Sequence, residues 1–79
     1  MQIFHIIEET TDQQVIEIHA PSISDAIGRY ISVATNDNWE SIEKNGNVLI
    51  WDFPDEYCIM TMATPNLVFA RWTHKKGLY

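Results

Sequence analysis

Cysteine is almost absent from this chain of 79 residues, which contains a single one, Cys58. A lone cysteine excludes an internal disulfide and a zinc site built from several thiolates. Because small secreted domains usually carry several disulfides, we expect a reducing compartment. Long apolar runs are missing too: no segment reaches the roughly 18 residues of a membrane span, and the N-terminus lacks the basic flank of a signal peptide. The sequence therefore predicts a soluble, cytoplasmic protein.

Basic residues are scarce, five against eleven acidic ones, which gives a net charge of −6. All eleven acids lie within residues 1–56, and residues 57–79 hold three of the basic residues. Nucleic-acid affinity depends on neutralising phosphates, so we do not expect the acidic part to bind nucleic acid directly. Such a part would instead attract a basic protein surface, for example a phosphate-binding groove. The plainer interpretation, that the charge only confers solubility, stays open.

Catalytic motifs are also missing: the sequence has no P-loop, dinucleotide-binding glycine pattern, nucleophile elbow or zinc motif. Cys58 lies in an apolar run, which favours a buried thiol over a reactive thiolate. A hairpin would bring His5 and His19 near Glu17, which allows a metal site of two histidines and one carboxylate, although an exposed polar face is the simpler interpretation. We therefore expect a protein that is not an enzyme and that has no cofactor.

One stretch has helical periodicity. Its apolar residues recur at the spacing of a single stripe, which predicts an α-helix over residues 22–34. Ser22 suits the start of this helix, and Asp25 places negative charge where the helix dipole favours it. Gly28 within the helix costs about 1 kcal/mol relative to alanine, and it permits close approach of a neighbouring element.

The rest of the chain has the composition of strands and turns. Strands are predicted over residues 2–9, 14–20, 39–44, 47–53, 57–63 and 67–73. Their short linkers favour antiparallel pairing between consecutive strands. The expected fold is a single α+β domain over residues 1–79, in which an antiparallel sheet of five to six strands packs against one α-helix, in the order β-β-α-β-β-β-β.

The first hairpin has two possible registers, which differ in the face that each residue occupies. The register that we favour places Phe4 and Ile6 on the core side and leaves His5, Glu17 and His19 exposed. It also leaves three apolar side chains on the outer side of the sheet, namely Ile3, Ile7 and Val15. Apolar residues on the outer side of a thin sheet suggest that another chain covers it.

The second hairpin is predicted from Asn45-Gly46, because both residues of a tight hairpin turn need positive φ. A two-residue turn there pairs Lys44 with Asn47, Ile42 with Leu49 and Glu40 with Trp51. One face of this hairpin would then hold Ile42, Leu49, Trp51 and Phe53, and the other Val48 and Ile50.

The first half of the chain resembles small phage and mobile-element proteins in its layout. A strand ending in acids, Phe4-His5-Ile6-Ile7-Glu8-Glu9, is followed by a polar turn, the strand Val15-Ile16-Glu17-Ile18-His19-Ala20, a serine and a helix containing Asp25-Ala26-Ile27. Over residues 3–34 this layout is similar to DpnD/PcfM-like proteins and to some anti-CRISPR inhibitors. The resemblance to the inhibitors implies stoichiometric binding to a CRISPR effector or nuclease, without catalysis.

These observations predict a small acidic binding protein, an inhibitor of the anti-CRISPR type that occludes a basic surface of a nucleic-acid-handling complex. The expected contacts are acidic residues and two tryptophans, the latter because tryptophan is frequent at interface hot spots: Glu40, Glu43, Asp52, Asp55, Glu56, Trp39 and Trp51. Core filling is the simpler role for the tryptophans, and a solvated turn for the carboxylates near Pro54. The alternative function is a structural or accessory protein that forms homo-oligomers through the outer face of its sheet.

Overall fold

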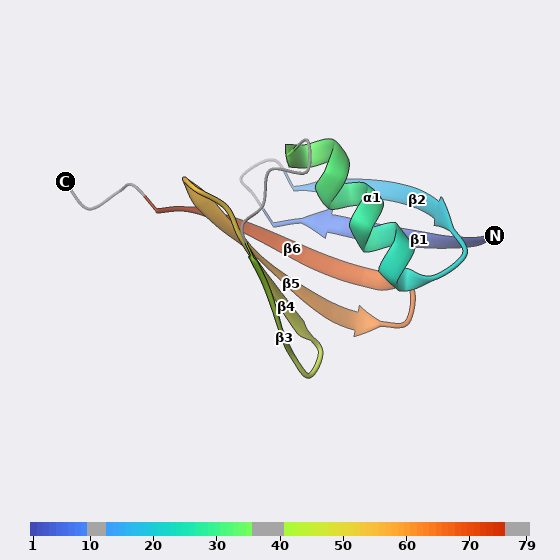
Figure 1. Ribbon diagram of the computed structural model, residues 1–79. Helices are drawn as coiled ribbons and strands as arrows, with labels where there is room; N and C mark the ends of the chain where they lie inside the picture. The colour runs from blue at the N-terminus through green and yellow to red at the C-terminus, as the bar shows by residue number, and fades with distance from the viewer. Residues whose placement is uncertain (10–12, 36–40, 76–79) are drawn as a thin grey trace.

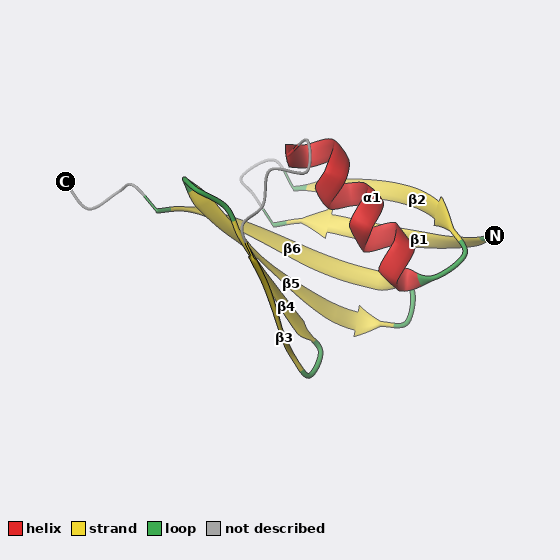
Figure 2. Ribbon diagram, in the orientation of Figure 1, coloured by secondary structure: helices red, strands yellow, loops and turns green. Residues whose placement is uncertain are grey.

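The computed structural model describes residues 1–9, 13–35 and 41–75 (Figure 1). Its elements follow the predicted order: β1 (Gln2–Glu8), β2 (Gln14–Ala20), α1 (Ile23–Thr35), β3 (Ser41–Asn45), β4 (Val48–Asp52), β5 (Glu56–Thr64) and β6 (Leu67–His74). All six strands belong to one sheet, and α1 lies on one face of it (Figure 2). The α+β class is therefore confirmed. Within the described ranges, no helix is both long and apolar enough to cross a membrane.

The sheet is mixed, with the strand order β2-β1-β6-β5-β4-β3. Strands β3 to β6 pair consecutively and antiparallel, as predicted, but β1 pairs parallel with β6. The prediction of a purely antiparallel sheet with consecutive neighbours is wrong. Because the helix lies between β2 and β3 in the chain, β3 need not pair with β2. Instead, β6 pairs with the edge of β1 that is not bonded to β2.

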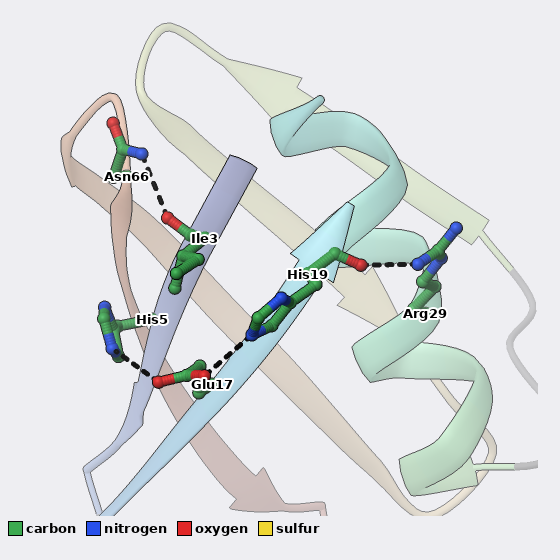
Figure 3. A network of polar contacts seen from close by, with 6 residues as sticks. All are labelled: Ile3, His5, Glu17, His19, Arg29 and Asn66. Carbon is green, nitrogen blue, oxygen red and sulfur yellow. Dashed lines mark hydrogen bonds and ion pairs between the residues drawn. The ribbon is translucent and has the colours of Figure 1, made fainter. Parts of the chain in front are cut away.

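Hydrogen bonds between β1 and the turn that joins β5 to β6 support this parallel pair. The amide of His5 donates to the carbonyl of Asn66 at 2.9 Å, and the Asn66 side-chain Nδ2 donates to the carbonyl of Ile3 at 3.0 Å (Figure 3). Further along, the amide of Glu9 donates to the carbonyl of Ala70 at 2.8 Å. The backbone groups of Ile3, His5 and Glu9 therefore face β6. Backbone groups alternate in direction along a strand, so those of the intervening residues face β2.

The helix begins where the sequence predicts. The Ser22 hydroxyl accepts a hydrogen bond from the amide of Asp25 at 3.2 Å, and the Ser22 carbonyl accepts one from the amide of Ala26 at 3.0 Å. The apolar stripe is buried at Ala26, Ile27, Tyr30 and Ile31. Gly28 faces open space, since an added Cβ would meet no atom within 4 Å. The expected close approach at Gly28 is therefore wrong.

The first hairpin adopts the favoured register. Phe4 lies opposite Ile18 and Ile6 opposite Ile16, and both β1 side chains are buried in the core. His5 lies opposite Glu17 on the other face. Alternation of buried and exposed positions thus determines which face each residue of this hairpin occupies.

The second hairpin turns one residue later than predicted. Asn45 pairs with Val48, so the turn residues are Gly46 and Asn47, and Gly46 has a φ of 62°. The predicted pairing of Lys44 with Asn47 is wrong, because Gly46 supplies the left-handed conformation at the first rather than the second turn position. Moving the turn by one residue changes each partner by two positions, which leaves the faces unchanged. Ile42 accordingly shares the helix side with Trp51.

Candidate partner-binding surface

The face of the sheet opposite α1, here called the outer face, carries a band of apolar side chains. Strand pairing places Val15 beside Ile7, Ile7 beside Phe69, and Ile59 beside Ile50. Most members are half-buried by their neighbours, whereas Val15 is 62% and Ile3 45% exposed. The apolar band consists of Ile3, Ile7, Val15, Val48, Ile50, Ile59, Leu67 and Phe69. Within the described ranges, the only helix lies on the opposite face, so it leaves this band uncovered.

Two of the predicted acidic contacts lie beside the apolar band. Glu43 lies directly opposite Ile50, and Asp52 follows Ile50 by two residues on the same face. Such diagonal neighbours are about 7–8 Å apart, so the two carboxylates form one acidic end of the outer face. Asp55 lies in the adjoining turn between β4 and β5, and it is exposed.

The remaining predicted contacts are placed differently. Glu56 alternates with Tyr57 and therefore shares the helix side with Cys58. Trp51 is only 8% exposed and belongs to the core, which agrees with core filling, the simpler of the two roles that the sequence allows it. Trp39 and Glu40 lie outside the described residues. The aromatic side chain within the apolar band is Phe69. It alternates with Val68 and Ala70, which are both buried, and this alternation is the signal that could have placed Phe69 on the outer face.

A lysine that the sequence argument missed lies at the acidic end. Lys75 Nζ is 2.5 Å from Asp52 Oδ1 and donates to the carbonyl of Phe53 at 2.7 Å. The Lys75 amide donates to the carbonyl of Asp55 at 2.9 Å. The predicted acidic cluster is thus partly neutralised. No local pattern signals this contact, because it joins two side chains that are 23 residues apart in the chain and lie at the ends of strands that are not direct neighbours.

Three polar residues at the opposite side of the outer face form a network (Figure 3). His19 Nε2 lies 2.7 Å and His5 Nε2 3.6 Å from the Glu17 carboxylate. The hydrogen bond with His19 lowers the pKa of Glu17 below its ordinary value, and the charges of both histidines act in the same direction. Among the described residues, no group of three or more His, Cys, Asp or Glu side chains is arranged to hold a metal ion.

The single thiol is buried on the helix side of β5. Cys58 is fully enclosed in the core, and this burial raises its pKa to about 12. A thiol with that pKa is almost wholly protonated at neutral pH and is a poor nucleophile. The prediction of a buried thiol is confirmed.

The comparisons with known proteins give no match: no protein family, no curated protein and no solved structure resembles this chain closely enough to count.

Proposed function

We propose that this chain is a small acidic binding protein, an inhibitor that occludes a basic surface of a nucleic-acid-handling complex in the cytoplasm and catalyses no reaction. The observation that carries the proposal is the outer face, where an apolar band that the described helix leaves uncovered ends at the carboxylates of Glu43 and Asp52. The resemblance of residues 3–34 to anti-CRISPR inhibitors points to a CRISPR effector or nuclease as the partner.

The chemistry of the outer face suits a protein partner. Specific interfaces combine an apolar centre with a polar rim, and aromatic side chains often supply the anchors. Here the apolar band would supply the centre, with Phe69 as the anchor, and Glu43 and Asp52 would form part of the rim. The net charge of −6 favours encounter with a basic surface. Because Lys75 already pairs with Asp52, Glu43 is the better carboxylate to test.

The test measures cleavage of target DNA by a panel of guide-loaded CRISPR effectors during titration with this protein. We expect complete inhibition of one effector at about one equivalent, with weaker inhibition at high salt because exposed charges are screened. Glu43→Lys should weaken inhibition about tenfold or more, since it places a cation against a basic surface.

The matched control is Asp25→Lys, which makes the same charge change on α1, on the opposite side of the sheet. It should leave inhibition within about twofold of the wild type, because the contact surface is untouched. If no effector is inhibited at a stoichiometric amount, or if both variants weaken inhibition equally, the proposal is wrong.

The second candidate is a structural or accessory protein whose copies pair outer face to outer face. The apolar band favours it. The carboxylates of Glu43 and Asp52, which both copies would bring, oppose it, although each copy also brings the exposed Arg71 on the same face. Sedimentation of the wild type and of Phe69→Lys separates the two candidates. A dimer that Phe69→Lys dissociates supports self-pairing through this face, whereas hetero-binding requires no such dimer.

A further inference from the structure

Strand β2 is an edge of the sheet, because its only strand neighbour within the described residues is β1. The odd-numbered residues of β1 direct their backbone groups toward β6, so Phe4 and Ile6 bond to β2 through Ile18 and Ile16. The alternate residues of β2, which are Val15, Glu17 and His19, therefore point their N–H and C=O groups away from the sheet. Arg29 confirms this direction, since its guanidinium donates to the His19 carbonyl at 2.5 Å.

Apart from the charge of Glu17 and the guanidinium of Arg29 at the His19 carbonyl, this edge lacks the devices that usually protect an edge strand from pairing. Such devices include short length, lysine, proline and bulges. Strand β2 runs for seven residues and contains no lysine or proline, and its register with β1 is unbroken. The other edge strand, β3, has only five residues and includes Lys44. Among the described residues, β2 is therefore the edge that is more open to another strand.

An apolar groove of about 330 Å³ lies between β2 and α1. Ile16 and Ile18 line it from the strand, and Tyr30 and Val33 line it from the helix. Val33 is 85% exposed. A strand added beside β2 would direct every second side chain to this groove, so apolar residues at alternate positions would fill it.

We propose that β2 pairs antiparallel with β2 of a second copy of this chain, which supplies such a strand. The outward backbone groups must lie opposite one another, which limits the pairing to alternate registers. A register with Glu17 opposite its own copy would bring two carboxylates together, which is destabilising. A shift that places Glu17 opposite the partner copy's His19 instead sets each carboxylate beside an imidazole, the group with which Glu17 already forms a hydrogen bond within one chain.

In this register Ile18 lies on the two-fold axis and faces its own copy on the helix side of the sheet. Ile16 then lies opposite Ala20, which is also apolar and on the same side. The backbone bonds join Glu17 to His19 in both directions, and the His19 carbonyl has a second lone pair besides the one that Arg29 occupies. The apolar and the polar side chains of β2 are thus both self-complementary, which is the reason for choosing a second copy as the occupant. The pairing does not depend on the proposed function.

Sedimentation equilibrium tests the pairing by comparing the full wild-type chain with a variant that carries a proline in β2. The wild type should form a dimer at about 100 μM, a concentration suited to a small interface. Glu17→Pro removes an outward N–H and no bond to β1, so it should raise the dissociation constant by about 100-fold or more while circular dichroism stays unchanged.

Two matched variants identify the cause. Glu17→Ala removes the carboxylate but keeps the N–H, so it should dimerise with at most a tenfold loss. Lys44→Pro removes an outward N–H at β3, the other edge, and should leave the dimer intact. A wild type that stays monomeric at this concentration, or a dimer that Glu17→Pro does not weaken, would overturn the proposal.

A disulfide test locates the axis. In the proposed register the two Ile18 Cα atoms are about 4.5 Å apart, within the range of a disulfide. Mild oxidation of Ile18→Cys should therefore give a covalent dimer. Ile16→Cys should not, because its two copies are four residues out of register, or about 13 Å. Equal cross-linking of both variants contradicts this register, and a monomer that binds only an extended peptide at β2 contradicts the choice of a second copy.

Discussion

The hydroxyl of Tyr30 on α1 lies 2.5 Å from the Glu8 carboxylate of β1 and donates a hydrogen bond to it. The same hydroxyl accepts a hydrogen bond from the indole Nε1 of Trp72 on β6 at 2.8 Å. One phenol therefore joins the helix to both strands of the parallel pair. Burial, and then the hydrogen bond to Glu8, raise the pKa of Tyr30 far above its ordinary value.

Removing this hydroxyl should destabilise the fold. Tyr30→Phe keeps the ring in the core but leaves the Glu8 carboxylate and the Trp72 indole without their shared partner. We expect a loss of about 1–3 kcal/mol in the free energy of unfolding, measured in urea. The control is Tyr57→Phe on the outer face, which should change stability by no more than about 0.5 kcal/mol. Equal effects of the two variants would show that the Tyr30 network contributes no stability.

Two glycines should respond to alanine in opposite directions. Gly28 is exposed in the middle of α1 with open space around it, so Gly28→Ala should stabilise the protein by about 1 kcal/mol through helix propensity. Gly46 has a φ of 62°, so Gly46→Ala should destabilise by about 1–2 kcal/mol, since a side chain disfavours that conformation. Thermal unfolding checks both signs. A Gly28→Ala variant less stable than the wild type would contradict the open space beside the helix.

Alkaline pH should weaken the fold through two buried groups that lose a proton at high pH, the thiol of Cys58 and the phenol of Tyr30. The pKa of Cys58 is raised from an ordinary value of 9.0 to about 12 in the folded chain. Between these pH values the unfolded chain releases the thiol proton while the folded chain keeps it, so stability is full below about pH 9 and falls as the pH rises to about 12. The slope should approach 1.4 kcal/mol per pH unit for this thiol. Tyr30 acts in the same direction.

Urea titrations from pH 8 to pH 11 measure this slope. Cys58→Ala lowers stability at every pH because it leaves a cavity. It should also make stability fall less steeply with pH, because the thiol proton no longer contributes to the slope. Tyr30→Phe should reduce the slope above pH 10. A slope that both variants leave unchanged would mean that other groups cause the alkaline loss.

The sequence predicts those features that depend on local alternation. The helix and the faces of both hairpins follow from the spacing of apolar residues, and so does the burial of Cys58. The parallel pairing of β1 with β6 does not, because neither strand carries a signal for the direction of a neighbour so distant in the chain.

The candidate surface likewise has features that local alternation predicts and features that it does not. The apolar residues of the outer face, including Ile7 and Val15, follow from strand period alone. The acidic end follows only in part. The side of the sheet on which Glu56 lies follows from its alternation with Tyr57, whereas the contact of Lys75 with Asp52 joins the end of the last strand to β4, which local alternation does not show.

The parallel pair itself can be tested at Asn66, whose side chain donates to the carbonyl of Ile3. Asn66→Ala removes this bond and should cost about 0.5–1.5 kcal/mol of stability. The loss should be local: the His5 amide, which bonds to the Asn66 carbonyl, should exchange its hydrogen faster, because the turn is no longer fastened to β1. Asn45→Ala, in the turn-proximal end of β3, is the matched control and should leave His5 exchange unchanged. Faster exchange at His5 in both variants would indicate a general loss of stability, and unchanged exchange in Asn66→Ala would show that the backbone ladder alone holds β6 beside β1.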